Sequence, residues 1–138
     1  MDIDYAKLVK TAYDAKRNAY VPYSGFSVGA ALLTRNGRIY DGCNIENAAY
    51  TPSNCAERTA FFKAVSEGER DFIAIAITAT NQKGDDCMAF PCGVCRQVME
   101  EFTDPHTFKV IIAKNISEFK EYTLEELLPF GFGPKDLK

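Results

Sequence analysis

Residues 72–80 read FIAIAITAT, and this stretch is the strongest indication of the fold class. It is apolar, rich in β-branched side chains and free of charge. Runs in which apolar residues do not alternate with polar ones are typical of a strand buried on both faces of a sheet. Residues 108–113, FKVIIA, form a second run of this type. The sequence therefore predicts a sheet whose central strands are covered on both sides.

Helical patterns alternate with these strands along the chain. Apolar residues near the N-terminus recur at helical spacing, and Asn36-Gly37 is a strong signal for a hairpin turn. Helices that alternate with apolar strands predict one α/β domain over residues 1–138, with a mixed sheet between helices. The expected elements are helix 3–20, strands 26–34 and 38–43, helix 55–68, strand 72–80, helix 92–102, strand 108–113, a short strand 119–122 and a last helix after a capping box at 123–126.

Composition and charge exclude several classes of protein. The 138 residues fit one domain, and 46% hydrophobic with 25% charged residues are globular proportions. The net charge is −3 and no long basic run is present, which disfavours nucleic acid as the main partner. The N-terminus lacks the features of a signal peptide, and no apolar stretch approaches the roughly 20 residues of a membrane span. We expect a soluble cytoplasmic protein without a membrane partner.

Five cysteines in a reducing compartment call for a metal, catalytic or packing role before disulfides. Cys55 opens one expected helix, and Cys92 and Cys95 open the next. Residues three apart share a helix face, and the partial positive charge of a helix N-terminus stabilises thiolates. Zinc binds such ligands in four-coordinate geometry, and three protein ligands leave one position for water. The pattern predicts a catalytic zinc site.

Glu57 lies two residues after Cys55 and can reach the same site. Zinc lowers the pKa of water to about 7 from about 15.7, so a carboxylate there could pass the water's proton to a substrate. Two other interpretations stay open. A redox Cys-x-x-Cys pair would leave Cys55 and Glu57 unexplained, and a structural four-cysteine site would need Cys43 or Cys87. The only histidine, His106, follows a proline in an expected turn and gives a nucleophile triad little support.

Together these residues resemble a known signature. Cys55-Ala-Glu57 followed by Pro91-Cys-Gly-Val-Cys95 is similar to the zinc deaminase motif His-x-Glu and Pro-Cys-x-x-Cys. Cysteine in place of histidine, together with residues 21–32, 42–50 and 127–132, resembles the short, homotetrameric cytidine deaminases, and the resemblance covers nearly the whole chain. It implies a three-layer α/β/α sandwich with a mixed five-stranded sheet and one zinc ion per subunit. The implied reaction is hydrolytic deamination of cytidine and deoxycytidine to uridine and deoxyuridine with release of ammonia, in pyrimidine salvage.

The resemblance also implies roles for single residues. Cys55, Cys92 and Cys95 would bind zinc, and Glu57 would transfer protons. Arg58, assisted by Arg96, would hydrogen-bond the ligand sulfurs and offset their surplus negative charge. The implied substrate contacts are Phe26 on the pyrimidine ring, Asn44 and Glu46 on the ribose 3′-hydroxyl, the backbone N–H of Ala56 on the base carbonyl, and Phe132, which would reach into a neighbouring subunit's site. Tyr50 would be a contact between subunits near the site, in a homotetramer whose active sites are shared.

One position departs from the family pattern. Phe90 precedes Pro91 where relatives often have a smaller or polar residue, but the family uses the backbone carbonyl there, so its contact with the leaving amino group should survive. Three rivals remain: a deaminase for blasticidin S, a deaminase of polynucleotides, and a non-catalytic zinc module. Asn44 and Glu46 favour a substrate with ribose, charge and Cys55 disfavour polynucleotides, and a non-catalytic module predicts a fourth protein ligand.

Overall fold

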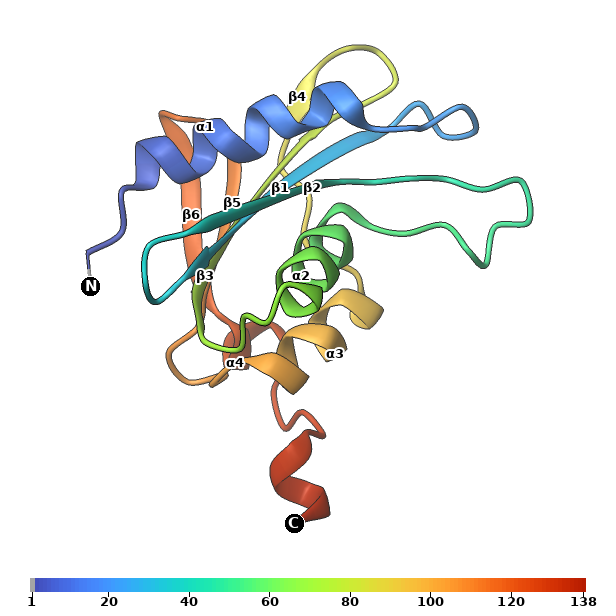
Figure 1. The fold of residues 1–138 in the computed structure, drawn as a ribbon. Coiled ribbons are helices and arrows are strands. Elements are labelled where there is room, and N and C mark those ends of the chain that lie inside the picture. Colours follow the sequence, from blue (N-terminus) through green and yellow to red (C-terminus); the bar gives the residue numbers. More distant parts are fainter. Residues whose placement is uncertain (1) are drawn as a thin grey trace.

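The computed structural model describes residues 2–138 and shows three layers (Figure 1). Helix α1 (Tyr5–Ala15) covers one face of a sheet, and helices α2 (Ala56–Ser66) and α3 (Gly93–Phe102) cover the other. A short helix α4 (Leu124–Leu127) begins at the expected capping box, in which Thr123 and Glu126 bond reciprocally. The predicted α/β/α sandwich is confirmed.

The sheet is mixed, as expected. Its strands lie in the order β2-β1-β3-β5-β6; β3 and β5 are parallel and the other pairs are antiparallel. A sixth strand of two residues, β4, pairs with the end of β3 and was not expected, because so short a segment has no sequence period. The strands are β1 (Ser27–Thr34), β2 (Ile39–Cys43), β3 (Phe72–Thr80), β4 (Asp86–Cys87), β5 (Lys109–Asn115) and β6 (Glu118–Thr123).

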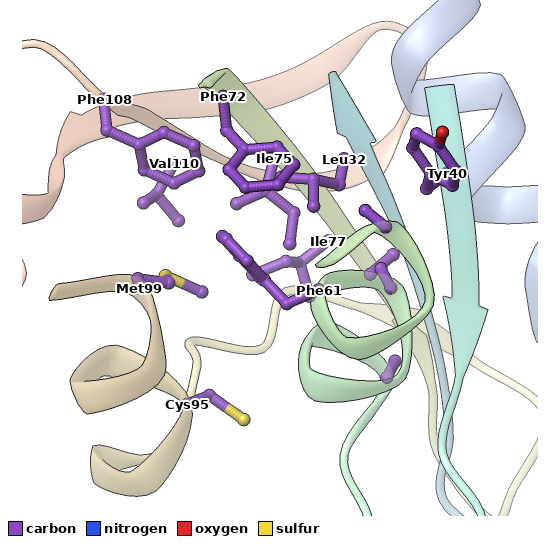
Figure 2. Close-up of a cluster of buried hydrophobic side chains, with 14 of the residues drawn as sticks. Leu32, Tyr40, Phe61, Phe72, Ile75, Ile77, Cys95, Met99, Phe108 and Val110 are labelled. Carbon is purple, nitrogen blue, oxygen red and sulfur yellow. The ribbon is translucent and has the colours of Figure 1, made fainter. Parts of the chain in front are cut away.

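Strand β3 is buried on both faces, as its sequence predicts. Its side chains alternate in size: Ala74 and Ala76 face α1, while Ile75 and Ile77 face α2 and α3. Figure 2 shows the larger cluster, in which Phe61 of α2 meets side chains from the sheet and from α3. The small alanines let α1 lie close to the sheet, and the larger residues fill the space beneath the two helices that carry the cysteines.

The first helix is shorter than expected. It was predicted to reach Tyr20, but α1 ends at Ala15 and is followed by a 3-10 turn, η1 (Lys16–Asn18). Tyr20 instead pairs with the segment after β2: its N–H donates to the carbonyl of Asn44 at 2.9 Å, and its carbonyl accepts from the N–H of Glu46 at 2.8 Å. This long-range pairing overrides the local helical pattern and draws residues 44–46 toward the start of β1. A second 3-10 helix, η2 (Pro134–Leu137), was also not expected.

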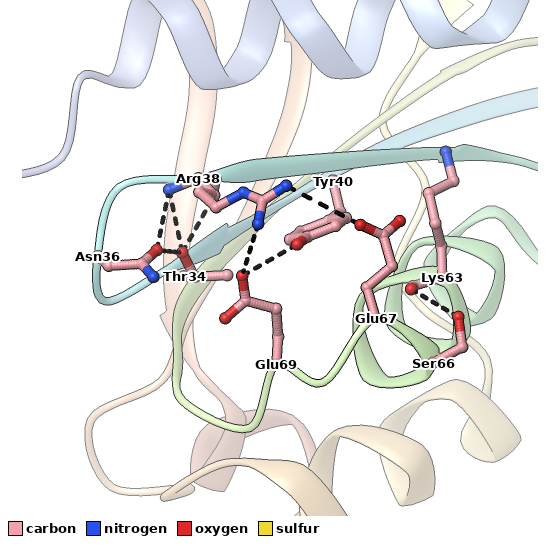
Figure 3. Close-up of polar contacts among 8 residues, drawn as sticks. All are labelled: Thr34, Asn36, Arg38, Tyr40, Lys63, Ser66, Glu67 and Glu69. Carbon is pink, nitrogen blue, oxygen red and sulfur yellow. Dashed lines mark hydrogen bonds and ion pairs between the residues drawn. The ribbon is translucent and has the colours of Figure 1, made fainter.

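A polar cluster ties the end of α2 to the edge strand β2 (Figure 3). The hydroxyl of Tyr40 donates to Glu69 at 2.9 Å, and the guanidinium of Arg38 lies 3.9 Å from Glu67 and 3.8 Å from Glu69. Arg38 is 62% exposed and Glu67 is 50% exposed, so their ion pair contributes little stability, typically about 0–1 kcal/mol, whereas Glu69 is 16% exposed. These contacts join Glu67 and Glu69, which follow α2, to the neighbouring strand β2.

Gly42 of β2 sets the distance between the sheet and α2. A Cβ added there would lie 2.5 Å from the carbonyl oxygen of Ala56 and 2.6 Å from the N of Ala60. We expect Gly42→Ala to lower the free energy of unfolding by about 1–3 kcal/mol, because the added methyl overpacks the interface. Chemical denaturation measures this. Gly93→Ala is the matched control, since nothing lies within 4 Å of a Cβ there. Equal stability of the two variants would contradict the prediction.

Residues 2–138 contain no helix that is both long and apolar enough to span a bilayer.

Candidate zinc and active site

Two helix N-termini bring the candidate residues together. Cys55 is the N-cap of α2 and Cys92 is the N-cap of α3, and both have extended backbone angles. The sulfur of Cys92 accepts from the N–H of Cys95 at 3.5 Å, which caps the first turn of α3. The helices lie side by side on one face of the sheet (Figure 1). The predicted convergence of the helix starts is confirmed.

The three sulfurs are spaced as zinc requires. The Sγ atoms of Cys55 and Cys92 are 3.7 Å apart, those of Cys92 and Cys95 are 3.6 Å apart, and all three lie within 4.8 Å of one another. A tetrahedral ion with zinc–sulfur bonds of about 2.3 Å needs its sulfurs about 3.8 Å apart. Among residues 2–138 the metal-ligating cluster has no fourth member, and Cys43 and Cys87 lie outside it. The donor set therefore fits a zinc ion with an open position.

Arg58 supplies positive charge to the cluster. Its Nη2 donates to the Sγ of Cys55 at 3.3 Å, the contact that was expected of it. Hydrogen bonds from Cys95, and then from Arg58 and Cys92, lower the pKa of the Cys55 thiol to about 5, although burial opposes the shift. The Nε of Arg58 is buried and has no hydrogen-bond partner within residues 2–138. The guanidinium is thus directed at the sulfurs, and its hydrogen bond to Cys55 is its main polar contact among the described residues.

Glu57 lies in the first turn of α2 with only 5% of its surface exposed. Burial raises the pKa of its carboxyl to about 7, and the neighbouring Cys55 adds to the rise. The charge of Arg58 opposes this rise only in part. A buried acid is costly and frequently marks a functional site. Glu57 lines the same cavity as Cys55 and Cys92.

That cavity has a volume of about 320 Å³, which falls in the range of about 300–1,000 Å³ typical of small-molecule sites. It brings together most of the residues predicted from the sequence and adds Ser24, Val28 and Ala89, which were not predicted. Ser24 could have been found from the sequence, because it lies between Pro22 and Gly25 in a segment whose composition is typical of a turn. The lining residues are Ser24, Phe26, Val28, Asn44, Glu46, Cys55, Ala56, Glu57, Ala89, Phe90 and Cys92.

Asn44 and Glu46 are held by the backbone of the opposite cavity wall. The Oδ1 of Asn44 accepts from the N–H of Val28 at 2.9 Å, and its Nδ2 donates to the carbonyl of Phe26 at 2.8 Å. Glu46 accepts from the N–H groups of Tyr23 and Ser24 at 3.0 and 3.1 Å and from the Ser24 hydroxyl. These bonds fix both side chains at the edge of the cavity. The Ser24 hydroxyl and backbone N–H groups also lower the pKa of Glu46.

Tyr50 and Phe132 lie outside this cavity. Tyr50 is 73% exposed, has a positive φ of 63°, and packs edge-on against Tyr23 with 6.3 Å between ring centres. It lines a second cavity of about 320 Å³ that shares Ser24 and Glu46 with the first. Phe132 is 59% exposed, and its carbonyl accepts from the side chain of Gln97. Neither aromatic side chain lines the cavity that holds Cys55 and Glu57.

Arg96 takes a different position from the expected one. Its Nε donates to the carbonyl of Pro91 at 2.7 Å, and its Nη1 donates to the carbonyl of Leu127. Its hydrogen bonds go to carbonyls and not to the sulfurs, because α3 directs the side chain toward α4. Arg96 therefore ties the residue before Cys92 to the C-terminal part of the fold.

The fold and this site define a class: an α/β protein with a three-thiolate zinc site and a buried carboxylate at paired helix starts. Residues 3–112 match the family model for the cytidine and deoxycytidylate deaminase zinc-binding region. This chain belongs to that family, and the cysteine cluster fits one zinc ion per subunit.

Known relatives agree with this assignment. The chain is 48% identical over 135 residues to the cytidine deaminase of Sporosarcina psychrophila, covering 98% of this chain and 96% of the relative. It is 45% identical over 132 residues to a probable cytidine deaminase of Dictyostelium discoideum, covering 95% and 85%. The crystal structure of cytidine deaminase from Burkholderia pseudomallei superposes with a TM-score of 0.84 at 41% identity, covering 94% of this chain and 100% of the other.

Proposed function

We propose that this protein hydrolytically deaminates cytidine and deoxycytidine to uridine and deoxyuridine, in pyrimidine salvage, as one deaminase domain over residues 1–138. One observation carries the proposal: two helix N-termini bring three cysteine sulfurs together, and two of these cysteines, Cys55 and Cys92, line one cavity with the buried carboxylate of Glu57. Cys55, Cys92 and Cys95 would hold the zinc ion. When bound, zinc supplies an activated water at neutral pH.

The chain's own residues would move the protons. Glu57 accepts a proton from the attacking water and gives it to N3 of the base as oxygen adds to C4. Glu57 then carries the second proton from the new C4 hydroxyl to the amino nitrogen, the bond between C4 and nitrogen breaks, and ammonia leaves. Water and cytidine are thus converted to uridine and ammonia, with every atom accounted for. The low exposure of Glu57 keeps competing bulk water away from this transfer.

Substrate contacts follow from the cavity walls. Phe26 would lie against the pyrimidine ring, the N–H of Ala56 would bind the base carbonyl, and Asn44 with Glu46 would bind the ribose hydroxyl. Ordered polar groups favour such recognition, because their geometry is already set before the ligand arrives. The existing hydrogen bonds of Asn44 and Glu46 support this role.

A nucleoside fits this cavity better than a nucleotide does. The described residues that line the two adjoining cavities include no lysine or arginine, and Glu46 is common to both. A phosphate group would meet a carboxylate without a compensating cation, and like charges at close range are unfavourable. This supports a free nucleoside as the substrate over deoxycytidylate or a polynucleotide.

We further propose a cytoplasmic homotetramer with shared sites. Phe130 is fully exposed, and Phe132 and Tyr50 are 59% and 73% exposed, which is unusual for large aromatic side chains. In an assembly, Phe132 and Tyr50 would reach toward a neighbouring subunit's site.

All five cysteines are free, which agrees with a reducing compartment such as the cytoplasm. Analytical ultracentrifugation tests the tetramer, and a monomer that is fully active would contradict it.

An ultraviolet assay together with zinc analysis tests the proposed function. We expect cytidine and deoxycytidine to be consumed by protein holding one zinc per chain, and deoxycytidylate and blasticidin S to be consumed far more slowly. Failure of zinc-loaded protein to deaminate either nucleoside would overturn the proposal. Preferential turnover of blasticidin S would favour the antibiotic-deaminase alternative.

Arg58→Gln is expected to lower kcat for cytidine by about tenfold, since groups that contact zinc ligands typically change activity or affinity by about 10–100-fold. The variant loses the charged hydrogen bond to Cys55. Steady-state kinetics and a thermal melt measure the two effects separately. Arg35→Gln, which breaks the exposed pair of Arg35 with Asp71, is the control. An unchanged kcat in Arg58→Gln would remove its electrostatic role.

A further inference from the structure

A half-buried polar network lies on the α1 side of the sheet, opposite the helices that carry the cysteines. The Nζ of Lys16 lies 2.7 Å from the Oγ1 of Thr80 and 3.3 Å from the Oδ1 of Asp86. The Thr80 hydroxyl donates to the same Oδ1 at 2.9 Å, and the Tyr13 hydroxyl donates to Oδ2 at 2.8 Å. Both oxygens of Asp86 are therefore bonded.

Among the ion pairs that residues 2–138 form, this one has the least exposed basic side chain. The Lys16 side chain is 8% exposed and that of Asp86 is 29% exposed, whereas Arg35 and Asp71, at the other end of β3, are 59% and 64% exposed. The ammonium of Lys16 also lies 3.6 Å from the centre of the Tyr13 ring. Shielding from water strengthens each of these contacts.

The helix end that presents Lys16 is itself firmly placed. Gly29 of β1 lies directly beneath it: a Cβ added there would be 2.0 Å from the carbonyl oxygen of Ala12 and 3.0 Å from the N of Lys16. Such close approach leaves the end of α1 no room to move toward the sheet. The backbone of Lys16 therefore has a fixed position, and its side chain can hold β4 through Asp86.

Strand β4 is held weakly by the sheet itself, since it pairs with β3 only through Asp86 and Cys87. The contact with Lys16 adds a further attachment. The chain then runs through residues 88–92 into the site: Ala89 and Phe90 line the cavity, and Cys92 belongs to the sulfur cluster. The side chain of Asp86 thus secures the start of the segment that ends at Cys92.

We infer that Lys16 and Asp86 are positioning residues, which hold residues 88–92 in place from the opposite face of the sheet and so set the cavity wall and the place of Cys92. The inference rests on the proposed function for its kinetic part. A displacement of about 1 Å in such a support can cost about 10²-fold in rate.

The test uses Asp86→Asn in the full-length zinc-loaded protein, because the amide keeps the size of the side chain and removes its charge. We expect zinc release to a chromogenic chelator to become about tenfold faster, as for other groups that support metal ligands. We also expect a higher KM for cytidine, since Ala89 and Phe90 lose their support, together with a lower kcat. Tyr13→Phe removes one hydrogen bond and should give a smaller change in the same direction.

Asp71→Asn is the matched control, because it removes a carboxylate paired at 2.9 Å near the opposite end of β3. It should release zinc at the unsubstituted rate. Equal zinc release from Asp86→Asn and the unsubstituted protein, or equally fast release from Asp71→Asn, would overturn the inference. If Asp86→Asn does not fold, the same measurements are made on Tyr13→Phe. Tyr13 is partly exposed on the surface of α1, so this substitution should not prevent folding.

The cobalt-loaded proteins give a readout that does not depend on turnover. Bands from cobalt–thiolate bonds should shift in Asp86→Asn and stay unchanged in Asp71→Asn. If the unsubstituted protein binds metal but deaminates no nucleoside, the proposed function fails while zinc release and the cobalt spectra still test the positioning role. If the unsubstituted protein is active and the Asp86→Asn spectrum and release rate are unchanged, only the positioning role fails.

Discussion

Glu57→Gln is expected to lower kcat for cytidine by about 10²–10⁴-fold while the protein keeps its zinc. The amide has the shape of the carboxyl but cannot accept the water's proton, so both proposed transfers stop. Because Glu57 is 5% exposed, bulk water and buffer have little access to replace it. Single-turnover kinetics with cytidine, together with zinc content, measure the loss.

The chain offers a matched control for this substitution. Glu100 of α3 is equally buried, at 4% exposure, and lies against Gly131 and Gly133, outside the substrate cavity. Glu100→Gln should keep kcat near the unsubstituted value. Full activity in Glu57→Gln, or an equal loss in both variants, would refute the assignment of Glu57 as the group that transfers protons.

Cys92→Ala is expected to abolish both zinc binding and deamination. Alanine leaves two sulfurs, and losing a ligand should cost more than the roughly 100-fold in metal affinity that can follow from losing a group that only supports one. The substitution also removes the sulfur that caps α3, so an additional destabilisation of about 1 kcal/mol is expected. Zinc per chain, activity and a denaturation curve separate these effects.

Cys43→Ala and Cys87→Ala are the controls, since both cysteines lie outside the sulfur cluster. They should bind one zinc per chain and keep their activity. Retention of zinc by Cys92→Ala would contradict the ligand set, and loss of zinc from either control would show that a fourth cysteine takes part in the site.

Much of the fold could be predicted from local pattern. The uncharged run at 72–80 predicts a strand covered on both faces because every side chain of such a run must avoid water, and β3 is that strand. The starts of α2 and α3 coincide with Cys55 and Cys92, because the residue types at helix ends follow from the unpaired N–H groups there. The candidate zinc ligands and Glu57 could be predicted from the sequence as well, because within each helix N-terminus they lie only two or three residues apart.

Local sequence patterns therefore suffice to predict most helices and strands, their arrangement in layers, and the reactive side chains at the N-termini of α2 and α3. Contacts between segments that are distant in the sequence become visible only in the folded structure. There, α1 ends at Ala15 because Tyr20 pairs with residues 44–46, Arg96 donates to backbone carbonyls, and Lys16 pairs with Asp86 of β4, a strand too short to predict. The physical reason is that spacing along the chain encodes which face a side chain occupies, whereas its partner on another segment depends on how the whole core packs.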